Sequence, residues 1–126
     1  MVQTLDMSGI EFVYDRYTEH YGNPCHNWNN ALKFSKGDLI HYMALDDSLA
    51  SPNSVELIVE YMKKNPSIQW AVSAHIINPS YRVFIPRWNP DILTCNTLSG
   101  PSAIIIRQNL QHICLDPQFI WFLDTD

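Results

Sequence analysis

Residues 39–62, LIHYMALDDSLASPNSVELIVEYM, join a short apolar run, two adjacent acids and an amphipathic segment. The run 39–45 is too short for a free-standing helix, and its nearly continuous apolar character predicts a buried parallel strand. Ser51 before Pro52 predicts the start of a helix. Apolar side chains then recur at helical spacing, at Val55, Ile58, Val59 and Met62. The stretch therefore predicts a unit of strand, acidic loop and helix.

The flanking sequence continues this alternation of strands and helices. Asn23 and Pro24 predict the start of a helix that runs to about Lys36, where Gly37 stops it. The helix that follows the acids is expected to end before the Asn-Pro pair at 65–66. Further strands are expected at 10–14, 69–77, 82–85 and 103–106. We expect one α/β domain over residues 1–126, with a mostly parallel central sheet flanked by helices.

Length and composition fit one folded domain of moderate charge. The chain has 126 residues, 46% of them hydrophobic, which is enough for a core. Its net charge is −5 and its eight Lys and Arg residues form no stripe, so nucleic acid is not an expected partner. No apolar run approaches the roughly 20 residues that span a bilayer, and the N-terminus lacks signal-peptide features.

The cysteines indicate a reducing environment. Three cysteines are an odd number, lie far apart and form no CxxC pair: Cys25, Cys95 and Cys114. This pattern predicts neither a disulfide framework nor a four-thiolate zinc site. We expect a cytoplasmic location, with peripheral attachment to a membrane left open for a longer form of the protein.

The adjacent acids Asp46 and Asp47 have two interpretations. Ligands of open parallel sheets gather beyond the carboxyl ends of the strands, where two carboxylates can hold Mg²⁺ or Mn²⁺ against a diphosphate. An acidic pair between a strand and a helix also serves simply to cap the helix and solvate the turn. These two residues alone do not decide between a metal site and ordinary turn chemistry.

Three segments in sequence order are similar to those of a known enzyme family. They are NWNNALKFSKGDLIHYMALDDSLASPNSVELIVEYMKKNP (27–66), NTLSGPSAIIIRQNL (96–110) and LDPQFIWFLDTD (115–126). In order and spacing they resemble family 2 glycosyltransferases with the GT-A fold, over about residues 23–126. The resemblance implies an incomplete GT-A domain, part of an inverting enzyme that moves a sugar from a nucleotide-sugar donor to a carbohydrate or lipid acceptor.

The resemblance assigns a role to each acidic residue. Asp46 matches the last acid of the DXD motif, which touches a Mn²⁺ or Mg²⁺ ion on the donor diphosphate, and Asp47 matches the acid that follows it. Ala44 stands where the first acid of the motif would be. Asp124 matches the second acid of the ED motif, the general base for the acceptor hydroxyl, and Asp126 competes with it for that role.

The middle segment implies donor and acceptor contacts. Ser99 and Gly100 are small residues before a strand, where backbone can approach a sugar closely, and an ordinary turn before Pro101 is an equal alternative. Arg107 follows the strand and is a candidate for a phosphate contact, whereas an arginine there is more often paired with an acid on the surface.

The remaining histidines, cysteines and tryptophans are weaker candidates for a functional site. His20, Cys25 and His26 lie close in sequence, but adjacent side chains do not converge on one tetrahedral metal, so a zinc site is not expected. Of the four tryptophans, Trp88 is the best candidate for stacking on a sugar face, because it stands in a proline-flanked loop between Arg87 and a polar residue.

The resemblance also implies that the chain is a fragment that lacks the strands holding the nucleoside. Such a fragment would expose an edge of the strand before Asp46, so we expect pairing into a homo-oligomer and weak nucleotide affinity. Two other functions stay open. One is a binding or assembly module whose acids are structural. The other is a phosphotransferase of the haloacid dehalogenase kind, which the adjacent rather than alternate acids disfavour.

Overall fold

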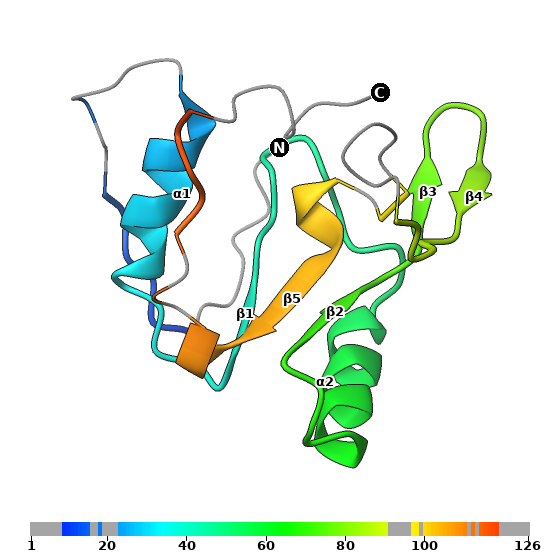
Figure 1. Ribbon diagram of the computed structural model, residues 1–126, viewed down its shortest axis with the longest axis horizontal. Helices are drawn as coiled ribbons and strands as arrows, with labels where there is room; N and C mark the ends of the chain where they lie inside the picture. The colour runs from blue at the N-terminus through cyan, green and yellow to red at the C-terminus, as the bar shows by residue number, and fades with distance from the viewer. Residues whose placement is uncertain are drawn as a thin grey trace.

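The computed structural model describes residues 9–15, 18, 23–90, 97–98, 100–110, 112 and 114–118 (Figure 1). The described part is a small mixed α/β structure. Its α-helices are α1 (Pro24–Leu32) and α2 (Ser54–Lys64). Its strands are β1 (Leu39–His41), β2 (Trp70–Val72), β3 (His75–Ile77), β4 (Arg82–Phe84) and β5 (Ile104–Arg107). Two single 3₁₀ turns, η1 (Pro101–Ala103) and η2 (Gln108–Leu110), flank β5.

Helix α1 begins where the sequence predicts. The Asn23 side chain accepts a hydrogen bond from the Cys25 amide at 3.0 Å, and Pro24 occupies the first turn. The α-helical bonding ends at Leu32, four residues before the predicted end. The next three amides bond to carbonyls three residues back, at 3.1 Å each, so the helix tightens into a 3₁₀-like turn before Gly37.

The N-cap of α2 lies two residues after the predicted cap at Ser51. It is Asn53, whereas Ser51 lies in the preceding turn and donates its amide hydrogen to Ser54 Oγ at 3.1 Å. The C-terminal end at Lys64 agrees with the predicted stop before residues 65–66. One glutamate, Glu56, in the first turn and two lysines in the last complement the helix dipole.

The central sheet has the order β1–β5–β2, and both of its pairings are antiparallel. The prediction of a mostly parallel sheet is therefore wrong. The run 39–45 has the continuous apolar character of a parallel strand, but only residues 39–41 form β1, and Met43 and Leu45 are exposed. Because β1 and β2 are each antiparallel to β5, they point in the same direction, with β5 inserted between them (Figure 1).

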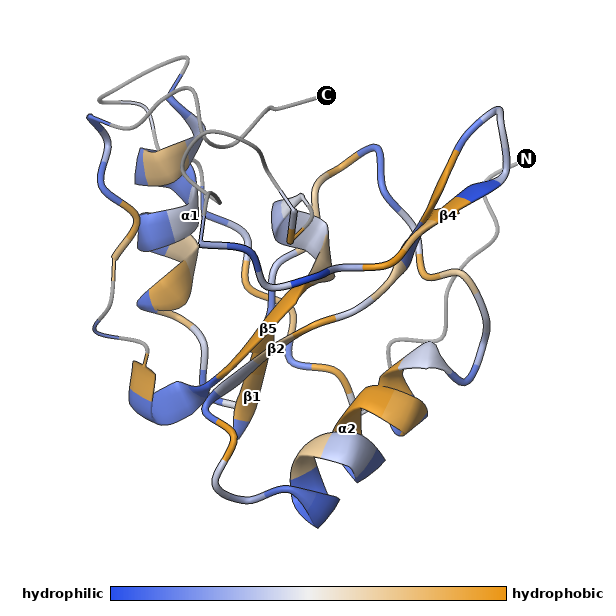
Figure 2. Ribbon diagram, turned by 45° about the vertical axis from the view of Figure 1, so that its right-hand side comes forward, coloured by the Kyte–Doolittle hydropathy of each residue, from blue (hydrophilic) through white to orange (hydrophobic). Residues whose placement is uncertain are grey.

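One helix covers each face of this sheet. Residues paired across an antiparallel sheet share a face, so Ile40, Ile106 and Trp70 lie together, opposite to Ile105 and its neighbours along the sheet. Figures 1 and 2 place α1 and α2 on either side of the three strands. The fully buried side chains come from the helices and β5, and the largest of them are Met62, Ile105 and Cys25.

Two predicted strands differ from those observed. Residues 10–14 form no strand; they lie as extended chain beside α1, held by bonds from Lys36 to Glu11 and from Asn30 to Asp15. Their side chains are exposed. The β-branched and aromatic residues of this segment favour a strand, but a strand also needs a neighbouring strand to pair with, and this segment has none among the described residues.

The predicted strand 69–77 divides into β2 and β3, which belong to different sheets. The break falls at Ser73, whose amide donates to the Ala103 carbonyl at 2.9 Å as the chain leaves β2. Beyond it, β3 and β4 form a separate antiparallel hairpin that projects from the side of β2 (Figures 1 and 2). The predicted segments at 82–85 and 103–106 are confirmed as β4 and β5 to within one residue at each end.

Candidate functional site

The two adjacent acids lie in a tight turn shortly after β1. The amide of Asp47 donates to the carbonyl of Ala44 at 3.2 Å, which closes a four-residue turn with Asp46 at its third position. Both carboxylates are exposed to solvent. We call residues 44–47 the acidic turn. It follows β1, as the sequence predicts, but the strand ends at His41 and not at the predicted Leu45, and the sheet is not parallel.

Ser102 ties the acidic turn to the loop before β5. Its hydroxyl oxygen accepts the amide hydrogen of Ala44 at 2.8 Å, and its carbonyl accepts a hydrogen bond from His41 Nε2 at 2.7 Å. A carbonyl only accepts, so His41 carries a proton on Nε2. These two bonds hold β1 and the following turn against η1 at the point where the antiparallel strands bring them together.

Gly100 stands immediately before η1, and it is thereby placed near the acidic turn. Its φ of −71° is open to any residue, and a Cβ built on it meets no atom within 4 Å. Neither strain nor close packing within the chain requires glycine here, which leaves open space on that side of the loop. Ser99 lies outside the described residues. The hydrogen bonds of Ser102 with Ala44 and His41 join the loop before β5 to β1 and the acidic turn.

Arg107 is not brought to this site. It pairs with Leu39 at the far end of β5 from the acidic turn. Its guanidinium donates to the carbonyls of Ile68 at 2.7 Å, Met62 at 2.9 Å and Asn65 at 3.3 Å. These carbonyls include the end of α2, where backbone acceptors lack helical partners. Arg107 is therefore a clamp that joins α2 to the sheet, and neither the predicted phosphate contact nor a surface ion pair describes its contacts.

The predicted bases Asp124 and Asp126 lie outside the described residues, but the segment that leads to them is held on α1. Asn29 forms a two-way pair with the backbone of Leu115: its Nδ2 donates to the carbonyl at 2.7 Å and its Oδ1 accepts from the amide at 2.8 Å. Asn23 Nδ2 donates to the Pro117 carbonyl at 3.1 Å. The side-chain amide of Asn29 thus donates to and accepts from the Leu115 backbone, as the backbone of a neighbouring strand would.

Cys25 takes part in the same contact and shows no metal-site character. It is 1% exposed, and burial together with the nearby negative charge of Asp116 raises the pKa of its thiol, against a smaller lowering by a backbone hydrogen bond. A buried thiol with a raised pKa is a poor metal ligand and nucleophile. The described contacts of Cys25 are those of a packed core residue, and His20 lies outside the described residues.

The carboxylates of the acidic turn suit only a cation that takes its remaining ligands from water or from a bound phosphate. Among the described residues, no group of three or more His, Cys, Asp or Glu side chains converges on a point. Asp46 and Asp47 offer carboxylate oxygens on an open surface. Mg²⁺ and Mn²⁺ commonly bind through one or two carboxylates and complete their shell with water and phosphate oxygens. The residues therefore fit a cation shared with a diphosphate and do not fit a protein-only cage.

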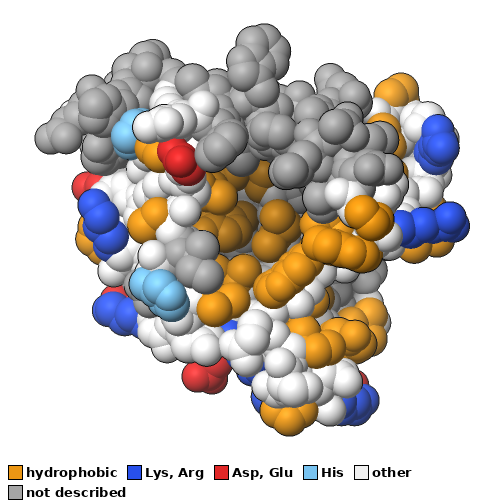
Figure 3. Space-filling model, in the orientation of Figure 1, with side chains coloured by type: hydrophobic (Ala, Val, Ile, Leu, Met, Phe, Trp, Pro, Cys, Tyr) orange, Lys and Arg blue, Asp and Glu red, His pale blue; other side chains and the backbone are white. Residues whose placement is uncertain are grey.

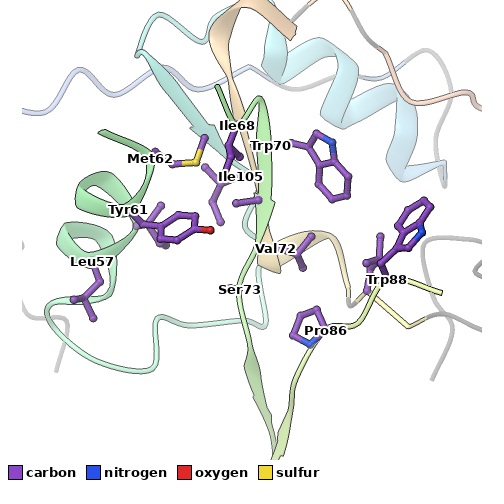
Figure 4. Close-up of a pocket in the computed structure, with 13 residues that line it drawn as sticks. Leu57, Tyr61, Met62, Ile68, Trp70, Val72, Ser73, Pro86, Trp88 and Ile105 are labelled. Carbon is purple, nitrogen blue, oxygen red and sulfur yellow. The ribbon is translucent and has the colours of Figure 1, made fainter. Parts of the chain in front are cut away.

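A separate apolar groove lies between α2 and the edge strand β2. It has a volume of about 480 Å³ and is bordered by Leu57 and Tyr61 of α2, Trp70 of β2, and Pro86 and Trp88 beyond β4 (Figure 4). Sequence reasoning missed this groove. The sequence signal that could have indicated it is the pair Leu57 and Tyr61. These apolar residues are four positions apart on one side of α2, outside the stripe predicted to be buried. Trp88 is 73% exposed at its rim, where sugar stacking stays a prediction.

Within the described residues, no helix combines the length and apolar character needed to cross a bilayer. The chain matches no family model, no curated protein and no solved structure.

Proposed function

We propose that this chain is part of an inverting glycosyltransferase that transfers a sugar from a nucleotide-sugar donor to an acceptor hydroxyl with a divalent cation. The observation that supports it most is the bond between Ser102 and Ala44. It ties Ala44, two residues before Asp46, to Ser102, two residues after Gly100, across 58 residues of sequence.

Asp46 is the proposed cation ligand, and Asp47 shapes the turn beside it. With Ala44 in place of a further acid, the turn supplies fewer anionic ligands, so the cation depends more on the donor diphosphate. The cation, when bound, supplies charge stabilisation to the leaving diphosphate. The chain's own contribution is to fix the position of Asp46, because its turn is closed at Asp47 and anchored at Ser102.

The second requirement of the reaction is a base for the acceptor. A carboxylate removes the proton of the acceptor hydroxyl, whose oxygen bonds to the anomeric carbon while the bond from that carbon to the diphosphate oxygen breaks. Asp124 or Asp126 is the proposed base. The paired contacts of Asn29 with Leu115 support this role indirectly, since they hold the segment from which these acids follow.

A binding or assembly module is the second candidate, and the apolar groove between α2 and β2 is the observation that favours it. Ligand sites are commonly apolar and concave with a few polar groups at their rims, as this groove is with Tyr61 and Trp88. In that case the acidic turn would be structural, and Asp46 would be dispensable for binding.

Cation binding separates the two candidates without knowledge of the sugar. Mn²⁺ would be titrated into the protein with and without uridine diphosphate or guanosine diphosphate, followed by electron paramagnetic resonance of the free ion. We expect diphosphate-dependent binding that Asp46→Asn weakens at least about tenfold, since a carboxylate ligand is lost. Glu56→Gln, an exposed acid in the first turn of α2, is the matched control. Equal binding in all three proteins would contradict the proposal.

A further inference from the structure

The β3–β4 hairpin is unusually apolar for an element that projects from the body. Ile76 pairs with Val83 across the hairpin, so these two side chains share one face, and Ile85 follows two residues later in the extended chain. Their exposed fractions are 47%, 56% and 63%. In a half-buried hairpin such a face packs on a core. We call Ile76, Val83 and Ile85 the aliphatic face.

The hairpin region is also free of acids. Residues 73–90 contain two arginines, Arg82 and Arg87, and no Asp or Glu, while the rest of the chain carries a net charge of −7. Neither arginine forms a salt bridge with a described residue. Figure 3 shows basic and hydrophobic side chains, without acidic ones, over this projecting part of the molecule. The charge of the hairpin is thus opposite to that of the chain as a whole.

Two large aromatic side chains border the same region. Tyr81 is 78% exposed at the turn end, and Trp88 is 73% exposed at the base. Tyr and Trp have an apolar ring with one polar group, which suits the boundary between lipid tails and headgroups. An aliphatic face, two cations without an acidic partner among the described residues, and two exposed aromatic rings together match an anionic bilayer surface.

We propose that the β3–β4 hairpin docks on the surface of an anionic lipid bilayer. The aliphatic face enters the boundary of the acyl chains, and the turn and base aromatics lie at headgroup level. Arg82 lies on the opposite face, beside the turn, and its long side chain reaches around the rim to the headgroup phosphates. This membrane contact is independent of the chemistry proposed for the acidic turn.

A second copy of the chain explains these features less well. Edge-to-edge pairing of β3 or β4 with another strand satisfies backbone groups in the plane of the hairpin and leaves its aliphatic face exposed. A lipid surface covers that face directly and also uses the positive charge. Pairing between copies is therefore a distinct outcome that the experiment must recognise.

The test is flotation of the full chain with vesicles of phosphatidylcholine, prepared with and without phosphatidylglycerol. We expect binding to the anionic vesicles that falls with added salt. Replacing each arginine by glutamine should weaken partitioning about fivefold, the loss of one basic contact with an anionic surface. Ile76→Ser and Val83→Ser should each weaken it about tenfold by removing buried apolar area.

Matched controls lie on α2, on another side of the molecule. Lys63→Gln and Val55→Ser remove an exposed cation and an exposed aliphatic side chain there, and each should change partitioning by less than about twofold. The arginine variants leave the apolar hairpin intact, so they report on lipid contact even where a serine variant alters the hairpin. Absent binding, equal losses in the controls, or a dimer that Ile76→Ser dissociates without any vesicle binding would each overturn the proposal.

Discussion

The hydroxyl of Ser102 accepts the amide hydrogen of Ala44 at 2.8 Å, and this bond joins the end of β1 to the loop before β5. It spans 58 residues of sequence and leaves the exposed carboxylate of Asp46 on a turn whose backbone is held at one end by the sheet. A carboxylate on a fixed turn loses less conformational entropy when it binds a cation than a carboxylate on a free loop does. The position of Asp46 therefore depends on Ser102.

Removal of that hydroxyl should affect both stability and cation binding. Ser102→Ala leaves the Ala44 amide without its partner, and we expect a loss of about 1–2 kcal/mol in the free energy of unfolding. Diphosphate-dependent Mn²⁺ binding should weaken at the same time. Urea denaturation and Mn²⁺ titration provide the measurements.

Two matched variants make the result specific. Ser102→Thr keeps the hydroxyl and should retain most of both properties. Ser35→Ala removes an exposed hydroxyl whose bond to the Ala31 carbonyl is long, at 3.3 Å, and should cost less than about 0.5 kcal/mol. A Ser102→Ala protein as stable as the parent would show that the Ala44 bond holds nothing in place.

Arg107 should contribute to stability and not to diphosphate binding. Its guanidinium donates to three carbonyls at the end of α2 and just beyond it, so Arg107→Met leaves these acceptors without a charged donor. We expect a loss of about 2–3 kcal/mol, measured by urea denaturation. Arg82→Gln, at an exposed arginine of the hairpin, should be nearly neutral. Preserved stability with lost Mn²⁺-diphosphate binding would restore the phosphate role predicted from the sequence.

Asn29 should hold the segment that leads to the candidate bases. Asn29→Ala breaks both bonds to the Leu115 backbone, with an expected loss of about 1–2 kcal/mol. Hydrogen exchange at the Leu115 amide should become faster, because its acceptor is gone. Asn27→Ala, at an exposed position of the same helix, is the control. Unchanged exchange at Leu115 in the Asn29 variant would mean that the pair is not maintained in solution.

Alkaline pH should destabilise the protein through Cys25 and Tyr42. Burial is the main cause that raises the pKa of both groups, and nearby groups, Asp116 for Cys25 and Cys114 for Tyr42, add smaller increases. The folded state then holds these protons more tightly than the unfolded state. The contribution to stability is complete below the ordinary values of 9.0 and 10.0 and declines as pH rises through them.

The measurement is the urea midpoint as a function of pH from neutral to alkaline conditions. Tyr42→Phe removes one titrating group and keeps the ring that packs against Trp28 at a centroid distance of 5.6 Å. Its decline above the ordinary tyrosine pKa should be shallower than that of the parent. A parent protein whose midpoint stays constant across this range would contradict the raised pKa values.

Local features of the sequence predicted local structure well. Asn23 with Pro24 located the start of α1, and the stripe of α2 together with the Asn-Pro pair at 65–66 located its end. These features succeed because caps and helical periodicity act between neighbours along the chain. The acidic turn after β1 was predicted for the same reason.

Pairings between distant residues were not predicted. The direction of β5 between β1 and β2 depends on where the chain returns, which an apolar run such as IIIR does not encode. The clamp of Arg107 needs partners 39 to 45 residues away, and the two-way contact of Asn29 with Leu115 needs one 86 residues away. The groove at Leu57 likewise forms only when α2 packs beside β2. These are tertiary contacts whose residue types fit many other roles.

Paramagnetic mapping of Mn²⁺ on the ¹⁵N-labelled protein tests the central claim most directly. With a nucleoside diphosphate present, trace Mn²⁺ should broaden the amide signals of residues 44–48, Gly100 and Ser102 first, and Asp46→Asn should remove this effect while Glu56→Gln keeps it. Because Ser102 bonds to both Ala44 and His41, joint broadening of the two segments reports on the folded site. Broadening centred on other acids such as Glu60, or the same pattern in Asp46→Asn, would contradict the proposed cation site.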